Sequence, residues 1–89
     1  MNLLIGNITW KSDKVALSKK PFLFCFEKKC MSGRIKAIRK KRSDNEFEVE
    51  VSFIEPTFFE DEAIVGGKFT VREASRILGE GVVVKVVYT

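Results

Sequence analysis

The sequence predicts an all-β fold, a small antiparallel barrel in a single domain over residues 1–89. Apolar and polar residues alternate with a period of two, and no stretch keeps helical periodicity for three turns. Six strand-like segments follow one another at spacings of roughly 10 to 14 residues, which is typical of a barrel or a sandwich. Closure is favoured because a small sheet with two free edges would invite aggregation.

The strands are separated by residues that favour turns, namely Gly, Pro, Asn and Ser. The clearest strand is the fourth, in which apolar side chains alternate with acidic ones, so that one face packs in a core and the other meets water. The segment from Pro56 to Val65 is expected to be a long surface loop. The six expected strands are Asn2 to Trp10, Phe22 to Phe26, Gly33 to Lys41, Asn45 to Phe53, Lys68 to Glu73 and Val82 to Tyr88.

Two side-chain arrangements follow from this assignment. In the last strand, alternation places the side chains of Val82, Val84, Val86 and Tyr88 in the core. Between the third and fourth strands, a three-residue loop at Ser43-Asp44-Asn45 fixes a register. That register sets Arg42 opposite Glu46, Lys40 opposite Glu48, Ala37 opposite Val51 and Ile35 opposite Phe53.

Charge is distributed unevenly along the chain. Residues 1–42 contain twelve of the sixteen Lys and Arg residues and two acidic residues, whereas residues 43–89 contain four basic and ten acidic ones. The basic half is typical of a surface that binds a polyanion. The expected register nevertheless pairs part of the basic run with glutamates, so a self-neutralised surface remains an alternative. The basic residues without an expected partner are Lys36, Arg39 and Lys41, and the separate group Lys11, Lys14, Lys19 and Lys20.

Composition argues against catalysis. The chain has no His, which removes the usual general base near neutral pH and the base of Ser–His and Cys–His systems. Gly66-Gly67-Lys68 lacks the leading Gly and following Ser or Thr of a phosphate-binding loop. We therefore expect no catalytic residue, no metal site and no cofactor. A carboxylate-only enzyme is the remaining catalytic alternative, and no acid–base pair in the sequence favours it.

The start of the chain lacks the basic leader of a signal peptide, and no apolar run approaches the roughly 20 residues that span a bilayer. We expect a cytoplasmic protein without a membrane partner. A reducing cytoplasm disfavours a disulfide between Cys25 and Cys30, and two thiols are too few for a zinc site without His. Cys25, between Phe24 and Phe26, is interpreted as a small packed residue, and both thiols as structurally incidental.

The C-terminal part of the sequence resembles elongation factor Tu. The segment from Lys68 to Val86, KFTVREASRILGEGVVVKV, is similar to that family's aromatic strand ending in Arg-Glu-Gly-Gly-Arg, followed by Gly-x-Gly-Val-Val and Lys-Val. Upstream, VSFIEP at residues 51–56 resembles Val-Thr-Leu-Ile-His-Pro. Phe24-Cys25-Phe26, followed by Ser32-Gly33, resembles a Phe-Tyr-Phe strand and a Val-Thr-Gly turn. The similarity runs in order from about Pro21 to Val87.

The resemblance implies a specific fold and a set of partners. The fold is the third domain of these factors, a six-stranded antiparallel Greek-key β-barrel that helps to hold aminoacyl-tRNA and contacts other proteins without catalytic residues of its own. Neither the GTPase domain nor the second barrel is present in this sequence, so no nucleotide binding is implied. The family's Gly-Gly turn becomes Ala74-Ser75, whose Cβ atoms disfavour positive φ and close backbone approach.

Two functions are therefore carried forward. The first is a non-catalytic module that binds a protein partner, linked to translation by the resemblance, with Phe58 and Phe59 of the acidic loop as contact candidates. The second is binding of tRNA or another RNA through the Lys/Arg-rich half. The RNA-contact candidates are Ser32, Arg34, Lys36, Arg39, Lys41, Arg72, Glu73 and Ala74.

Overall fold

A computed structural model describes residues 3–11, 20–59 and 61–88 and confirms the all-β prediction. Two strands are longer than expected, because β3 begins at Lys29 and β6 begins at Arg76. Asn2, the expected start of the first strand, lies outside the described residues. The elements are β1 (Leu3–Trp10), β2 (Phe22–Phe26), β3 (Lys29–Lys41), β4 (Glu46–Phe53), the short 3-10 helix η1 (Pro56–Phe59), β5 (Lys68–Glu73) and β6 (Arg76–Val87).

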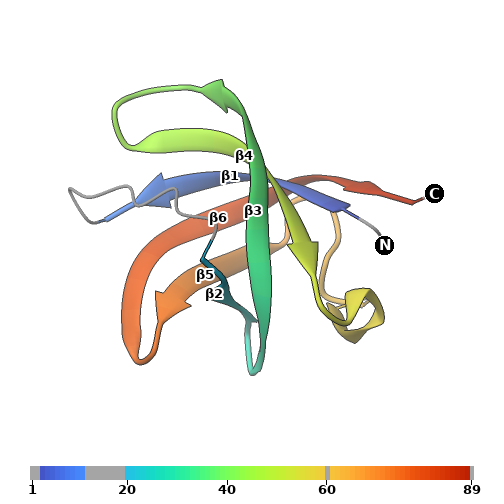
Figure 1. Ribbon diagram of the computed structural model, residues 1–89. Coiled ribbons are helices and arrows are strands. Elements are labelled where there is room, and N and C mark those ends of the chain that lie inside the picture. Colours follow the sequence, from blue (N-terminus) through green and yellow to red (C-terminus); the bar gives the residue numbers. More distant parts are fainter. Residues whose placement is uncertain (1–2, 12–19, 60, 89) are drawn as a thin grey trace.

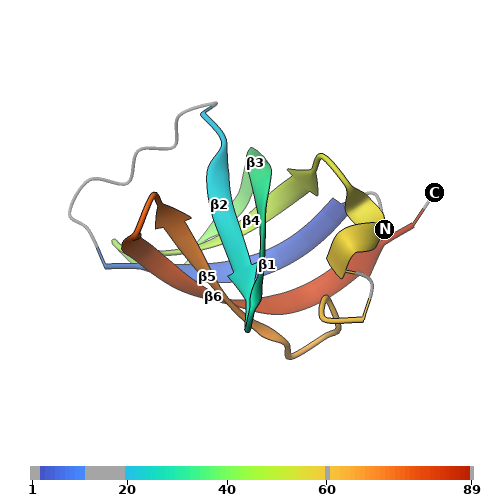
Figure 2. The ribbon, with the colours of Figure 1, turned by 90° about the horizontal axis from the view of Figure 1, so that it is seen from below.

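The six strands close into an antiparallel barrel with the order β1-β4-β3-β2-β5-β6 (Figure 1). Within it, β2, β3 and β4 are joined in sequence, and β5 returns to pair with β2. The spatial order β5-β2-β3-β4 is that of a Greek key. Seen from below, η1 lies at one side of the barrel, in the connection between β4 and β5 (Figure 2). Every strand therefore has two neighbouring strands, although β3 pairs with β2 only from Lys29 to Gly33 and continues to Lys41 beside β4 alone.

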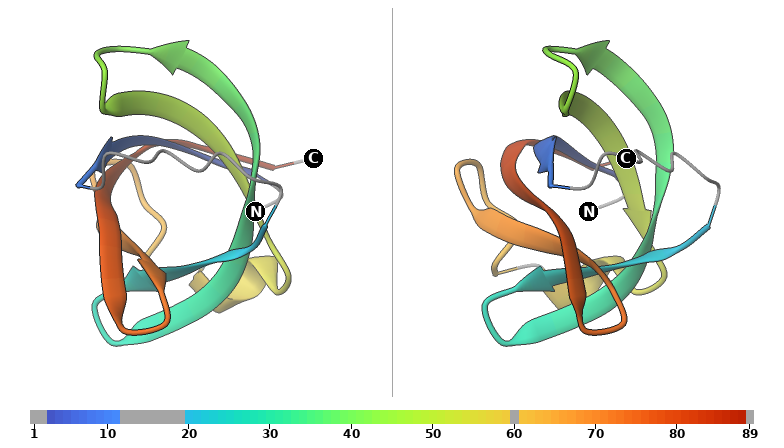
Figure 3. Two further views of the ribbon diagram at one scale, coloured as in Figure 1. Left: turned by 60° about the vertical axis from the view of Figure 1, so that its left-hand side comes forward. Right: turned by 90° about the vertical axis from the view of Figure 1, so that its left-hand side faces the viewer.

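The strands curve around one interior (Figure 3). Aromatic side chains fill it. Phe24 packs edge-on against Phe53 with ring centroids 5.4 Å apart, and Phe26 lies 5.3 Å from Phe69. The first pair has the edge-to-face arrangement that aromatic rings favour, and the second pair is tilted at 41°. On β6, Gly81 faces the Phe69 ring so closely that a Cβ at this position would overlap it. The Phe69 ring therefore fits in the core only because Gly81, on the neighbouring strand, has no side chain.

The register between β3 and β4 agrees with the prediction at the turn and departs from it further along. Lys40 lies opposite Glu48, and the Arg42 N–H donates to the Glu46 carbonyl at 2.8 Å, as the three-residue loop implies. Two bulges then intervene, one at Lys36 and one at Arg39. Each adds one residue to β3, so the register has shifted by two at the far end of the pair. Ile35 is therefore opposite Val51 and Ala37 opposite Glu50, which corrects both expected core pairs.

The expected core face of β6 is also corrected. Val83 is buried, while Val82, Val84 and Tyr88 are exposed and only Val86 packs partly against the core. A bulge explains the change of face, because β1 pairs Ile5 with Lys85 and then Gly6 with Val83, leaving Val84 without an opposite residue. An extra residue reverses the alternation beyond it. Simple periodicity therefore fails at Val84.

Candidate functional site

The RNA-contact candidates fall into two groups on the barrel. Ser32 on β3 and Arg72 on β5 both lie opposite Leu23 of the intervening β2 strand. Two strand spacings separate them, which is about 10 Å. Lys36, Arg39 and Lys41 continue along β3, and the ten residues of strand from Ser32 to Lys41 span roughly 30 Å. Only an extended ligand would contact both groups at once.

The first group includes the turn between β5 and β6. Glu73 lies opposite Arg76, and Ala74 adopts φ 55°, the left-handed conformation that its Cβ was expected to disfavour. The turn therefore keeps a shape typical of Gly in spite of the substitution. The side chain of Glu73 pairs with Lys20 Nζ at 2.8 Å, and this hydrogen bond lowers the pKa of its carboxyl group. Lys20 is thus the main partner of Glu73, and Arg76 has a weaker electrostatic effect on its carboxyl group.

Arg72 is held by its own strand. Its Nε donates a hydrogen bond to Thr70 Oγ1 at 3.0 Å, and the side chain is partly buried. Ser32 is also partly buried, whereas Arg34 is exposed and lies opposite Ser52. The structure therefore places three of the polar candidates on β3 and β5, the two strands that flank β2, while the charges of the turn are already engaged within the protein.

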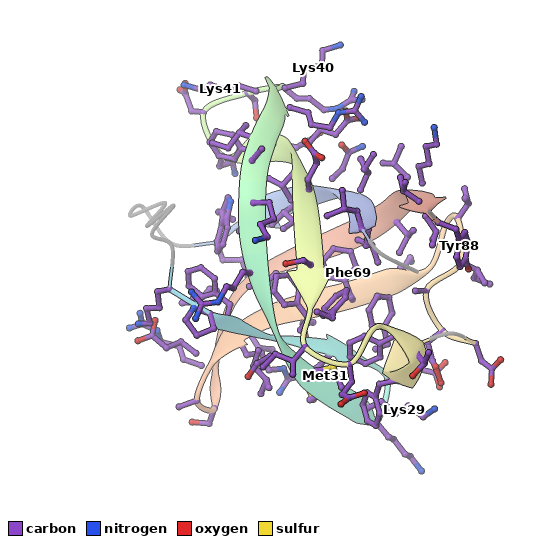
Figure 4. The ribbon with its side chains drawn as sticks, turned by 45° about the vertical axis from the view of Figure 1, so that its right-hand side comes forward. Lys29, Met31, Lys40, Lys41, Phe69 and Tyr88 are labelled. Carbon is purple, nitrogen blue, oxygen red and sulfur yellow. A yellow bond between two sulfur atoms is a disulfide. The ribbon has the colours of Figure 1, made fainter. Side chains whose placement is uncertain are left out.

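The second group lies on the hairpin that projects from the barrel, and it is called here the basic ribbon: Lys36, Arg39, Lys40, Lys41 and Arg42. All five residues are exposed, and Figure 4 shows Lys40 and Lys41 at the tip. The Glu48 carboxylate forms ion pairs with Arg39 at 4.0 Å and with Arg42 at 3.7 Å, and Lys41 lies 3.8 Å from Asp44. Such long, solvated pairs contribute about 0–1 kcal/mol each. Within the described part of the chain, Lys36 and Lys40 form no ion pair.

Lys11 and Lys20 were expected to have no acidic partner, and the structure gives each of them one. Lys11 pairs with Glu80 at 3.1 Å, and Lys20 pairs with Glu73, so neither is without a partner. Lys14 and Lys19 lie outside the described residues. The basic character of the first half of the chain is thus partly neutralised by acidic residues of β5 and β6. These pairs join segments far apart in sequence, which periodicity within one hairpin does not reveal.

The two protein-contact candidates have opposite environments. Phe59 is 0% exposed, and its ring lies 4.7 Å from Phe26 and 5.1 Å from Phe53. It therefore caps the barrel core, and the expectation that it contacts a partner is corrected. Phe58 is 40% exposed, with the Lys29 ammonium 5.5 Å from the centre of its ring. Only Phe58 remains accessible to a partner.

Further apolar side chains of the same connection are accessible to solvent. The connection surface, defined as Ile54, Phe58, Ile64 and Val65, lies between β4 and β5. Ile54 is 76% exposed, Ile64 60% and Val65 70%. The end of the connection is held against β6 by reciprocal backbone hydrogen bonds of 2.8 Å, from Gly66 N–H to the Val83 carbonyl and from Val83 N–H to the Gly67 carbonyl. The connection is thus fixed to the barrel while its apolar side chains face water.

Lys29 joins the β2–β3 hairpin to this connection (Figure 4). Its Nζ lies 2.7 Å from Glu62 Oε1, and this hydrogen bond is the main reason why the pKa of Lys29 is raised above its ordinary value. The second carboxylate oxygen of Glu62 is buried without a hydrogen-bond partner among the described residues. Lys29 therefore neutralises the most enclosed acid of the loop.

Cys25 and Cys30 form a disulfide, which corrects the interpretation of both thiols as incidental. The turn at Glu27 and Lys28 brings β3 back along β2 so that the two cysteines lie directly opposite each other. The sequence-based assignment began the third strand at Gly33 and so left Cys30 outside any strand. The pairing became visible only with the true start of β3 at Lys29.

A groove of about 970 Å³ crosses the outer face of the sheet and was not expected from the sequence. Glu46, Thr9, Glu80 and Thr70 contribute to it from four adjacent strands, each lying opposite the next. Its charges have both signs, because Lys68 and Arg72 also line it. Such a surface can hydrogen-bond a polar ligand without selecting anions or cations. No sequence signal identified it, since the row forms only when four strands are brought into register.

Within residues 3–11, 20–59 and 61–88, no three acidic or sulfur-bearing side chains gather as a possible metal site. The same residues contain no helix with the length and apolarity needed to cross a membrane. A scan against protein-family models finds none that matches the chain, and a search of curated proteins finds no significant relative. The resemblance to elongation factor Tu therefore rests on the motifs quoted above and stays a prediction.

Proposed function

We propose that this chain is a non-catalytic binding module whose connection surface contacts a partner protein. The observation that carries the proposal is the exposure of Ile54, Ile64 and Val65, between 60% and 76%, on a connection anchored by a fully buried Phe59. Isolated exposed apolar residues are normal, whereas several on one fixed segment are typical of an interaction site. A segment held in place loses little conformational entropy on binding, which favours affinity.

The charges of the connection indicate the chemistry of the partner. Glu55 and Asp61 are exposed, while Glu62 is already paired with Lys29. A partner surface with an apolar centre and basic residues at its edge would complement this arrangement. The resemblance to the third barrel of elongation factor Tu makes a component of the translation machinery the first partner to test.

The experiment is quantitative capture of proteins from native cell extract by the immobilised chain, with RNase present. The double variant Ile54→Ser/Ile64→Ser should lose at least tenfold of any specific partner, because both changes remove exposed apolar contact area without touching the core. Ile77→Ser is the matched control, since Ile77 is 39% exposed on β6 and lies outside the connection surface. Equal capture by the native chain and the double variant would refute the proposal.

A second candidate function is RNA binding by the basic ribbon. The observation in its favour is that Lys36 and Lys40 are exposed on a projecting hairpin and unpaired within the described part of the chain. Phosphate contacts release counterions, so the affinity for a labelled stem-loop RNA should fall steeply with salt. Each Lys→Ala change on the ribbon should reduce the slope of log K against log salt by about 0.7–0.9. Lys85→Ala on β6 is the control, and absence of any RNA complex at low salt would exclude this function.

A further inference from the structure

The Cys25–Cys30 disulfide is open to attack from one side. Cys30 is exposed, whereas Cys25 is 3% exposed. Thiol–disulfide exchange requires a thiolate to approach one sulfur while the other departs. An incoming thiolate therefore reaches the bond at Cys30, and Cys25 is the leaving group.

The residues next to the disulfide contact the connection at Phe58, Phe59 and Glu62. Phe26 follows Cys25, and its ring lies 4.7 Å from that of the core residue Phe59. Lys29 precedes Cys30 and bonds to Glu62 at 2.7 Å, with its ammonium over Phe58. The two sides of the hairpin tip thus contact η1 and the segment that follows it, and the disulfide ties these two sides together.

The hairpin ends one residue pair beyond the disulfide. Phe26 and Lys29 form the last pair of the ladder before the turn. The turn itself contains Glu27 with φ 51°, a backbone conformation that costs free energy for most residues other than Gly and Asn. When the disulfide opens, the hairpin tip should therefore loosen before the rest of the barrel, and Lys29 should lose its fixed position against Glu62.

We propose that Cys30 is a thiol-exchange site, and that reduction of the Cys25–Cys30 bond by a dithiol releases the connection surface. One thiolate of the dithiol attacks Cys30 Sγ, the Cys25–Cys30 bond breaks, and Cys25 leaves as a thiolate that takes up a proton. The second thiol of the reductant then attacks the mixed disulfide and releases Cys30, so that two electrons pass to the protein and the reductant becomes a disulfide. The effect on partner binding rests on the proposed function, whereas the exchange reaction does not.

The site of attack can be mapped with glutathione, which lacks a second thiol within the molecule to resolve the mixed disulfide. Trypsin cleaves after Lys28 and Lys29 and places Cys25 and Cys30 on different peptides. Mass spectrometry after acid quenching should find glutathione on Cys30 at least tenfold more often than on Cys25. Equal labelling, or labelling of Cys25 alone, would overturn the assignment of Cys30.

Release of the connection can be measured by hydrogen exchange with and without dithiothreitol. Reduction should accelerate amide exchange at residues 57–59 and 61–63 at least tenfold, while exchange at residues 73–76, in the turn between β5 and β6, changes less than twofold. Cys30→Ser, which prevents the crosslink, should give the pattern of the reduced protein without reductant. Unchanged exchange at residues 57–59 and 61–63, or equal acceleration throughout the chain, would overturn the proposal of local release.

Capture of the partner in the two redox states tests the link to binding separately. The amount captured should differ at least fivefold between the oxidised and the reduced chain. Equal capture of a partner that depends on Ile54 and Ile64 would overturn redox control while leaving the proposed binding function intact. If capture depends neither on the redox state nor on Ile54 and Ile64, the binding function is refuted. The thiol-exchange and hydrogen-exchange results would remain valid in that case.

Discussion

Replacing Phe59 with Ala should destabilise the barrel far more than replacing its neighbour Phe58. Phe59 is fully buried, and its ring contacts those of Phe26, Phe53 and Phe58 with centroids 4.7, 5.1 and 5.2 Å away. Truncation of such a ring removes its burial energy and leaves a cavity, at a cost of about 3–5 kcal/mol. Phe58 is 40% exposed, so the same change there should cost about 1 kcal/mol.

Urea unfolding followed by tryptophan fluorescence measures both changes in the free energy of unfolding. A domain of this length has a total stability of about 4–13 kcal/mol, so Phe59→Ala removes a large share of it. Phe59→Leu keeps most of the buried volume and provides a folded comparison, with an expected loss of about 1–1.5 kcal/mol. If both alanine variants lose the same free energy, the assignment of Phe59 to the core and Phe58 to the surface is wrong.

Three further predictions concern packing, backbone conformation and charge. Gly81→Ala should cost about 1–3 kcal/mol because the new Cβ overlaps the Phe69 ring, and a Phe69→Leu background should reduce that cost in a double-mutant cycle; additive losses would contradict the contact. Ala74→Gly should raise the unfolding free energy by about 0.5–1 kcal/mol, because Gly adopts the φ of 55° without a Cβ penalty, and a lower melting temperature would argue against that conformation. Lys20 lowers the pKa of Glu73, so the stability from this pair is complete above the ordinary glutamate pKa of about 4.3 and is lost as the pH falls through the folded value. Glu73→Gln should therefore flatten the acid side of the urea midpoint against pH, and an unchanged profile would exclude the pair.

Much of the fold followed from patterns within single strands. The alternation from Glu46 to Phe53 predicted the buried and exposed faces of β4, since a strand that pairs without interruption keeps a strict period of two. The loop at Ser43-Asp44-Asn45 likewise predicted the pairing of Lys40 with Glu48, because turn length fixes the register next to the turn. Both features depend on residues close together in sequence.

The candidate site was predicted less completely. The basic residues of β3 were identified from composition, but the bulges at Lys36 and Arg39 decide in which direction their side chains point. Phe58 and Phe59 are adjacent and chemically identical, so no sequence pattern separated the exposed ring from the buried one. The rings of Phe26 and Phe53, on two other strands, make that distinction.

The sequence by itself determined that this chain forms six strands, where most of them lie, and that its first half is basic. Tertiary structure alone decided which charges are paired, which aromatic ring is accessible and which cysteines meet. The physical reason is that strand alternation and turn chemistry are local, whereas bulges, ion pairs such as Lys29 with Glu62, and the disulfide depend on register between strands. A shift of one residue between two strands exchanges the buried and exposed faces, and only the closed barrel fixes that shift.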